Sequence, residues 1–254
     1  MPPSRQPISL PVLADPEVPL YTGHLTGQLD RHLREVARNR LAETITGGLS
    51  KPGKMPCPAW GLPASRCRVG SSLEGTEGTV CHPDVCYAKK RNYLRQNVRD
   101  KLEERYQGLF HERDGVPLWT PSMIFLIDYF CDEYFRFFDS GDLQGENHYR
   151  NIITIARHVP RVKIWMPSRE ILTIQNVHRE MIREGIEFPK NLIPRISANL
   201  IDGKPPKGFP YTSAVISDTE KASCIAQSQK NQCDGEQGNC RACWNDPHVT
   251  YPLH

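Results

Sequence analysis

Nine cysteines are the residues of this sequence best suited to chemistry. Eight of them form an N-terminal and a C-terminal set, and only Cys131 stands apart. The N-terminal set is Cys57, Cys67, Cys81 and Cys86, and the C-terminal set is Cys224, Cys233, Cys240 and Cys243. Only two residues separate Cys240 from Cys243, a spacing that lets two thiolates reach one zinc ion or iron–sulfur cluster. The sequence therefore predicts bound metal.

A disulfide framework is the main alternative for so many cysteines, and unrelated buried or reactive thiols are another. Disulfides belong mostly to small secreted domains that follow a signal peptide. The first residues, from Met1 to Pro7, lead into a proline-broken segment without the apolar run of a signal peptide. A chain of 254 residues can also bury a full core without cross-links. We therefore expect reduced thiols and a cytoplasmic location.

Composition bounds the class of protein without identifying it. A hydrophobic fraction of 38% and a mean hydropathy of −0.53 are typical of a soluble protein. No run approaches the roughly 18 apolar residues of a membrane span, so no membrane partner is expected. A net charge of +3 is too small to predict a polyanionic partner by itself.

The elements that must position these cysteines follow from hydrophobic periodicity. Helices are predicted over 28–45, 89–107, 121–133, 145–158 and 170–184, and strands over 134–138, 162–166, 192–197 and 213–216. Alternating strands and helices predict an α/β fold of repeated β/α units around a parallel sheet, either open or forming a full or partial TIM-like barrel. We expect an N-terminal arm and basic helix (1–48), a β/α domain with a Cys-rich loop (49–220), and a Cys-rich metal-binding tail (221–254).

Polar residues follow each predicted strand. Ser140 and Asp142 follow the first, Arg169 the second, Ser197 and Asn199 end the third, and Ser217 follows the fourth. Such residues commonly cap the next helix. Because ligands bind at the carboxyl ends of parallel strands, we prefer the interpretation that these residues form a binding site.

Each cysteine set offers its own chemistry. If three N-terminal cysteines hold a four-iron, four-sulfur cluster, one iron stays open to a ligand, whereas four thiolates would close the site. The C-terminal set lies in a polar tail with few apolar residues, which a metal would order. A second cluster or zinc would serve there, and the tail could also supply ligands to the first cluster.

Basic residues follow Cys86 closely. A solvated helix face is the ordinary explanation of such a run, and phosphate contact with a nucleotide or nucleic acid is the other. The residues that would make this contact are Lys89, Lys90, Arg91, Arg95 and Arg99.

Several sequence blocks together resemble a bacteriophage and plasmid family known only as a numbered phage gene product. The blocks are Gly61–Ala64, the Cys81 to Lys89 segment, Phe135–Gln144, Pro167–Glu170 and Cys240–Trp244. The resemblance covers roughly residues 50 to 254 and implies a phage or mobile-element origin.

A more distant likeness is to radical S-adenosylmethionine enzymes. It implies that Cys67, Cys81 and Cys86 hold a four-iron cluster whose open iron binds S-adenosylmethionine. It also implies that Tyr87 lies beside the cluster, that Ser140 and Asp142 meet the methionine amino group, and that Arg169, Ser197 and Asn199 approach its carboxylate or ribose. The cysteine spacing here is wider than the compact loop of those enzymes.

Three hypotheses follow. The first is an iron–sulfur enzyme on a radical-SAM-like scaffold that modifies a nucleotide or nucleic acid. The second is a nucleic-acid-binding protein, stabilised by iron–sulfur clusters or zinc, without catalysis. The third is a zinc protein with structural thiolate sites, although no zinc-hydrolase motif is present.

Overall fold

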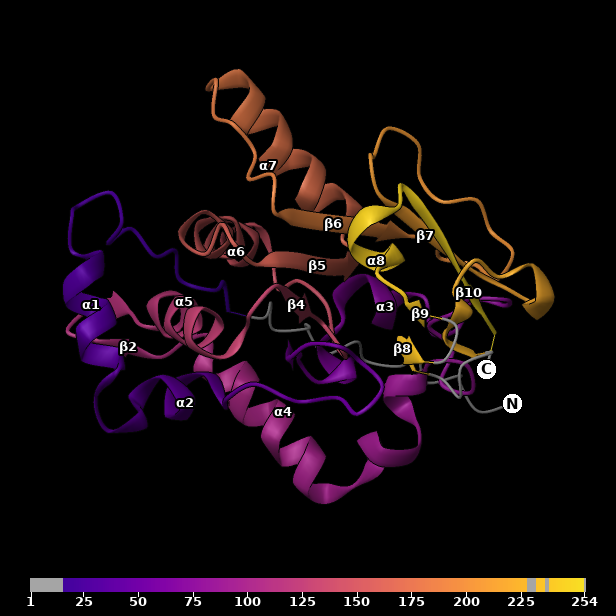
Figure 1. Cartoon of the computed structure of the whole chain (residues 1–254), viewed down its shortest axis with the longest axis horizontal. Coiled ribbons are helices and arrows are strands. Elements are labelled where there is room, and N and C mark those ends of the chain that lie inside the picture. Colours follow the sequence, from indigo (N-terminus) through magenta and orange to yellow (C-terminus); the bar gives the residue numbers. More distant parts are fainter. Residues whose placement is uncertain (1–15, 228–231, 236–237, 254) are drawn as a thin grey trace, which may run out of the picture.

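A six-stranded parallel sheet organises the computed structural model, which describes residues 16–227, 232–235 and 238–253 (Figure 1). The strands are β1 (Ala59–Trp60), β4 (Tyr134–Phe137), β5 (Lys163–Ser168), β6 (Leu192–Ser197), β7 (Thr212–Ile216) and β10 (His248–Pro252). They lie side by side in this order, and each pair of neighbours is parallel. The predicted α/β class with a parallel sheet is confirmed. Within the described residues β1 and β10 do not pair with each other, so the sheet does not close into a barrel.

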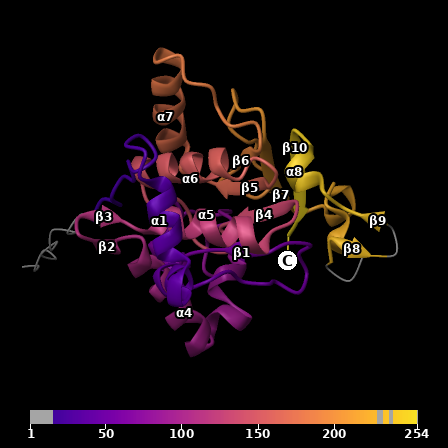
Figure 2. The same ribbon diagram turned by 60° about the vertical axis from the view of Figure 1, so that its left-hand side comes forward.

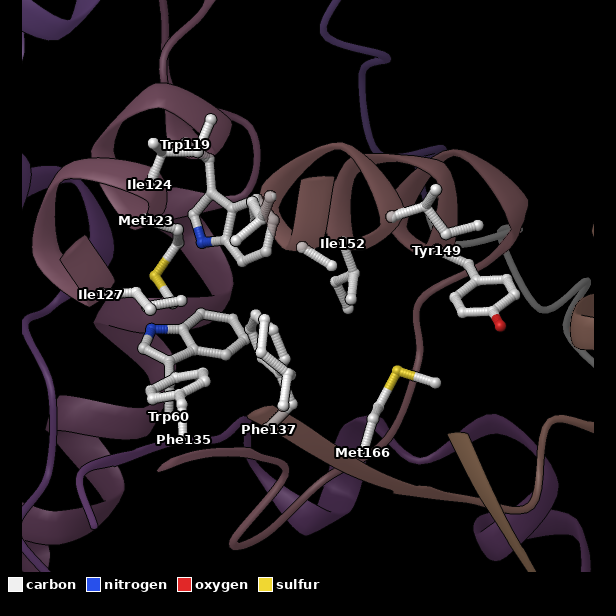
Figure 3. Packing of buried hydrophobic residues seen from close by; sticks show 14 of the residues in the cluster. Trp60, Trp119, Met123, Ile124, Ile127, Phe135, Phe137, Tyr149, Ile152 and Met166 are labelled. Atoms are coloured by element: carbon white, nitrogen blue, oxygen red, sulfur yellow. The ribbon is translucent and has the colours of Figure 1, made fainter. Parts of the chain in front are cut away.

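Helices cover one face of the sheet. They are α1 (Leu29–Val36), α2 (Leu41–Thr46), α4 (Gln96–Gly108), α5 (Trp119–Phe130), α6 (Glu146–His158) and α7 (Ile171–Arg183). Helix α5 packs against α1, α2 and α6, while α7 packs against α6. Figure 3 shows side chains of α5 and α6 pointing towards Trp60, Phe137 and Met166. The rings of Trp60 and Trp119 lie 5.2 Å apart, and this apolar layer is the main core.

The other face of the sheet carries a smaller buried cluster. Along β5, Ile164 and Met166 belong to the main core, whereas Trp165 points the other way because successive strand residues alternate. Trp165 packs with Cys57, Cys243 and Trp244. The last two belong to α8 (Ala242–Asn245), so the Cys-rich tail covers this face.

Short elements complete the fold. They are η1 (Arg38–Arg40), η2 (Ala64–Arg66), α3 (Arg68–Ser72), η3 (Tyr87–Lys89), η4 (Arg91–Leu94), β2 (Glu112–Arg113), β3 (Val116–Pro117), η5 (Thr219–Lys221), η6 (Ile225–Gln227), β8 (Asp234–Gly235) and β9 (Gly238–Asn239). Figures 1 and 2 both place the tail elements β8, β9 and α8 at the opposite end of the molecule from α1 and α2.

Both predicted basic helices are interrupted. The helix predicted over 28–45 divides at Arg40, whose φ of 60° is left-handed. The helix predicted over 89–107 begins only at Gln96, because Arg91 also has a positive φ of 51° and the preceding residues form 3₁₀ turns. A positive φ is incompatible with a continuous right-handed helix, so hydrophobic periodicity alone overestimated the length of both helices.

The predicted N-terminal arm falls partly outside the described residues, which begin at residue 16. Its described part packs against α6. Val18 and Tyr21 are fully buried, and the Tyr21 backbone N–H donates to the Asn151 side-chain oxygen at 2.9 Å. The described part of the predicted N-terminal arm therefore joins the core. Among the described helices, none combines the length and apolar character required to cross a bilayer.

Candidate functional site

Cys67 and Cys81 meet around Gly70 on α3. A Cβ atom at Gly70 would lie 2.9 Å from the Cys67 Cβ, 3.6 Å from the Cys81 Sγ and 3.7 Å from the Cys67 Sγ. Both sulfurs therefore lie within 3.7 Å of one point, although thirteen residues separate the two cysteines in the chain. A side chain at position 70 would displace them, so glycine is required by this close approach.

Hydrogen bonds hold the Cys81 segment at the carboxyl end of β6. The Cys81 N–H donates to the Thr79 hydroxyl at 3.2 Å, and that hydroxyl donates to the Asn199 carbonyl at 3.0 Å. The Val80 N–H donates to the same carbonyl at 3.1 Å. The position of Cys81 is thus fixed by a strand end more than a hundred residues away.

The segment of Cys86 is held at the carboxyl end of β4. Cys86 immediately precedes η3, and its N–H donates to the His82 carbonyl at 2.9 Å. The hydroxyl of the next residue, Tyr87, donates to the Asp139 carbonyl at 2.7 Å. The Tyr93 hydroxyl donates to the same carbonyl at 3.0 Å.

These three thiols share one neighbourhood with Asp142 and Arg169. Burial is the main cause of the raised pKa of Cys67, and the negative charges of Asp142, Cys86 and Cys81 raise it further, against Arg169. Burial likewise raises the pKa of Cys81, which Arg169 opposes. We call Cys67, Cys81 and Cys86 the edge thiol group, because they meet at the carboxyl edge of the sheet.

Asp142 joins the ends of β4 and β5. Its carboxylate accepts hydrogen bonds from the Ser168 hydroxyl at 2.6 Å, the Arg169 N–H at 2.9 Å and the Leu143 N–H at 2.8 Å. Burial raises its pKa, and these hydrogen bonds oppose the rise. Asp142 therefore positions the start of the β5–α7 connection, where Arg169 lies.

The other predicted cofactor ligands differ in what they contact. The Ser140 hydroxyl donates to the Leu62 carbonyl at 2.6 Å and so holds the end of β1. The hydroxyls of Ser197 and Ser213 lie 2.9 Å apart and bond each other. Among these predicted ligands, the Asn199 side-chain oxygen is the one that is buried without a hydrogen-bond partner within the described chain, which leaves it available to a ligand.

Ser217 lies apart from this arrangement. It is exposed, and its N–H and hydroxyl both bond the Asp202 carboxylate, at 2.9 and 2.7 Å. Ser217 therefore fixes the connection between β6 and β7.

Two residues that were not predicted as site residues anchor the Cys67 segment. The Glu170 carboxylate accepts from the Val69 N–H at 2.8 Å, and burial raises the pKa of Glu170 to about 7. The Gln144 amide donates to the carbonyls of Arg66 and Asp142, at 2.9 and 2.8 Å. In the sequence, the only indication of their role is their position: Glu170 directly follows Arg169, and Gln144 lies two residues after Asp142.

The predicted basic residues do not share one helix face, since α4 begins after most of them. Lys89 pairs with Glu74, and Lys90 donates to the Asp84 carbonyl. Arg91, Arg95 and Arg99 are exposed, and the Arg99 guanidinium donates to the Gln96 side chain at 2.7 Å. Of the five predicted basic residues, these three arginines are the exposed ones, and Lys89 and Lys90 are half-buried.

Cys57 lies with the C-terminal cysteines. The pKa of Cys57 is raised to about 12, mainly by burial, and the charge of Cys233 contributes. The sequence places Cys57 in the N-terminal set with Cys67, Cys81 and Cys86, whereas the structure packs it with Cys243 of the C-terminal set. We call Cys57, Cys224, Cys233, Cys240 and Cys243 the tail thiol group.

All nine cysteines are unpaired. In the chain as described, no three His, Cys, Asp or Glu side chains are arranged closely enough to hold a single metal ion. The edge thiol group is thus a convergence of side chains from separate segments of the chain.

The fold and these contacts define an open parallel α/β protein with thiols and charged groups at the carboxyl edge of its sheet. Residues 25–246 match the model of the family described as gene product 88, and the chain belongs to this family. The predicted resemblance to a numbered phage gene product is thereby confirmed. No curated protein and no solved structure matches the chain.

Proposed function

We propose that the protein is an iron–sulfur enzyme whose edge thiol group holds a four-iron, four-sulfur cluster. The observation that carries this proposal is the convergence of three thiols from separate segments beside Asp142 and Arg169. A four-iron cluster attaches each thiolate to a different iron, so its ligands need not converge as tightly as those of one ion. Thiolate ligation also suits a reducing host cytoplasm.

Three thiolates leave one iron of such a cluster without a protein ligand, and we propose that S-adenosylmethionine binds there. When bound, the reduced cluster and this cofactor supply a deoxyadenosyl radical. The Arg169 guanidinium can meet a carboxylate, and the unpartnered oxygen of Asn199 can accept from an amino group or ribose hydroxyl. Ser140 and Asp142 act as positioning residues, because their oxygens already bond the backbone and Ser168.

The fold supports this proposal. Each strand adds to the same edge of the sheet in chain order, as in an arc of a β/α barrel. We propose that this arc is a partial barrel whose carboxyl edge receives the substrate. The substrate we propose is a nucleotide or nucleic acid, because Arg91, Arg95 and Arg99 are exposed on the segment that follows Cys86.

Iron content and cofactor binding test the two parts of the proposal separately. Anaerobically reconstituted protein should contain iron and acid-labile sulfide in equal amounts and should bind S-adenosylmethionine. Cys67→Ala and Cys81→Ala should contain less iron than the wild-type protein and should not bind S-adenosylmethionine, whereas Cys131→Ala, outside both thiol groups, should match the wild type in both properties. Iron content that is the same in all three variants would refute the cluster at this site.

Asn199→Ala tests the cofactor contact. Only the backbone carbonyl of Asn199 holds the Cys81 segment, so this variant should keep its iron. Its affinity for S-adenosylmethionine should fall about tenfold, as expected for one lost hydrogen bond in a buried site. Unchanged affinity would remove Asn199 from the site, and wild-type protein that retains iron without binding the cofactor would refute the radical reaction.

A further inference from the structure

The tail thiol group is assembled from two distant parts of the chain, outside the proposed reaction site. The Cys233 N–H donates to the Lys54 carbonyl at 3.1 Å, which joins the tail to the segment that leads into Cys57. The Cys240 N–H donates to the Cys233 carbonyl at 2.8 Å. The Cys224 N–H donates to the Thr250 carbonyl of β10 at 3.0 Å.

The five thiols form one connected neighbourhood. The charge of Cys233 acts on Cys57, the charges of Cys224 and Cys240 act on Cys233, and that of Cys224 acts on Cys243. Cys57 and Cys243 are each 7% exposed and belong to the same buried cluster. Two thiols thus lie at the base of the group, and the other three are half-buried.

Aromatic and polar groups surround these thiols. Trp165 and Trp244 pack with Cys57 and Cys243, and the Cys243 sulfur lies 3.3 Å from the Tyr251 hydroxyl. The Trp165 indole N–H and the Arg136 Nε–H are buried without an acceptor within the described residues. Trp165 is only 5% exposed, and the Arg136 guanidinium lies 4.4 Å from its ring.

Buried N–H donors are normally satisfied, and sulfur bound to a metal is an acceptor for such donors. Two unsatisfied donors beside a group of five thiols are therefore a second indication of a thiolate-bound centre. The tail also contains too few apolar residues to order itself by burial alone, whereas metal binding can order such a segment.

We propose that the tail thiol group supplies the four ligands of a second metal centre, with Cys57 as one of them, distinct from that of the edge thiol group. This centre joins the segment before β1 to the tail that precedes β10, the two edge strands of the sheet. Its ligand class is a thiophilic metal, either an iron–sulfur cluster or zinc, and aromatic side chains shield it.

The test uses a full-length background that lacks the edge thiol group, Cys67→Ala with Cys81→Ala and Cys86→Ala. Iron, zinc and acid-labile sulfide are measured per chain after anaerobic purification. The background should retain one centre, and adding Cys57→Ser should lower the bound metal about tenfold. Adding Cys131→Ser is the stringent control, because Cys131 also lies near Cys57 but belongs to the main core. This control should retain the metal.

Iron with equal sulfide would identify a cluster, and zinc without sulfide a zinc site; both outcomes support the centre. Metal content that Cys57→Ser leaves unchanged, or that Cys131→Ser lowers equally, would overturn it. Loss of this centre says nothing of the proposed reaction site, which the background has already removed. Conversely, equal metal in wild-type protein and background would refute the edge cluster alone.

Should Cys57→Ser fail to fold by circular dichroism, thiol alkylation of the wild-type chain decides the question. Cys57 should react only after a chelator has removed the metal, whereas Cys131 should stay protected in both states. Equal protection of Cys57 before and after metal removal would overturn its assignment as a ligand.

Discussion

The two thiol groups differ in their surroundings. The edge thiol group lies among charged and polar strand ends, next to Asp142, Arg169 and Asn199. In the tail thiol group, Cys57 and Cys243 pack with Trp165 and Trp244, on the face of the sheet opposite the helices. Polar groups at strand ends can bind a ligand and respond to its charge, whereas an aromatic cover excludes one. The comparison suggests a reaction site at one group and a structural centre at the other.

Arg136 lies between the two groups. Its guanidinium donates to the Tyr87 hydroxyl at 3.1 Å, next to Cys86, and stacks on Trp165 beside the tail thiols. Its positive charge opposes the raised pKa values of Cys57, Cys233 and Cys243. One half-buried cation thus favours negative charge on Cys57, Cys233 and Cys243 of the tail thiol group, and it also holds Tyr87 beside the edge thiol group.

The largest expected effect concerns the tail. Arg195 is fully buried, and its guanidinium donates to the carbonyls of Thr212 at 2.7 Å, Asp246 at 2.6 Å and Cys243 at 3.1 Å. Arg195→Leu leaves these carbonyls unpaired, at a cost of about 1–3 kcal/mol for each one that stays buried. Urea unfolding should show this loss, together with reduced metal in the tail group.

Arg183→Leu on exposed α7 is the control and should change stability by less than about 0.5 kcal/mol. If Arg195→Leu were as stable as this control, the tail would not depend on its attachment to β6. Loss of metal from both thiol groups in equal measure would also contradict the separation drawn between them.

A smaller effect is expected from Gly70→Ala, which acts on the edge thiol group. The new Cβ would lie 2.9 Å from the Cys67 Cβ, closer than real atoms of this kind pack. Overpacking of this kind costs about 1–3 kcal/mol. Thermal unfolding should detect it, and metal should be lost from the edge group while the tail group keeps its own.

Gly75→Ala supplies the matched control in the same segment, because a Cβ there would meet nothing within 4 Å. It should be neutral or stabilising by up to about 1 kcal/mol. Equal behaviour of the two alanine variants would show that the cysteines do not depend on the close approach at Gly70.

The central strands could be predicted from the sequence because their apolar runs lie between clear helix patterns. The predicted strand over 192–197 matches β6, and the strand-end rule brought Asp142 and Arg169 together correctly. Strands β1 and β10 were missed. β1 has two residues and no periodicity, and β10 lies in a polar tail where pairing with β7, not hydrophobic pattern, defines it.

The candidate site was harder to predict, because hydrogen-bond partners decide what a polar residue does. Ser140 and Asn199 look equally suited to a ligand in the sequence, yet Ser140 bonds Leu62 and the Asn199 oxygen has no partner among the described groups. Cys57 belongs to the same set as Cys67 in the sequence, yet in the structure it packs with Cys243, Trp165 and Trp244.

Glu170, which anchors the Cys67 segment, should make the free energy of unfolding depend on pH. Burial raises its pKa from 4.5 to about 7, so ionisation is less favourable in the folded state. Stability of metal-free protein should therefore be greater at low pH and fall as pH rises from 4.5 to about 7. The change should be no more than about 3 kcal/mol, and Glu170→Gln should abolish it in urea titrations.

Glu112→Gln is the control, since Glu112 is exposed on β2, and it should preserve the wild-type pH profile. A Glu170→Gln profile that still falls over this range would assign the effect to another buried group. A wild-type profile that rises instead would contradict the sign of the shift.

The smallest effect is expected at the exposed arginines beside the edge thiol group, and it tests the proposed nucleic-acid partner. Lys89 and Lys90 already contact Glu74 and the Asp84 carbonyl, so phosphate binding would fall to Arg91, Arg95 and Arg99. Reversing the charge of each arginine should weaken binding to single-stranded DNA or RNA. The slope of log Kd against the logarithm of the salt concentration should also fall, by about 1 for each lost phosphate contact. Arg183→Glu, on the distant helix α7, should leave both unchanged. Equal salt slopes for all variants would show that nucleic acid does not bind at these arginines.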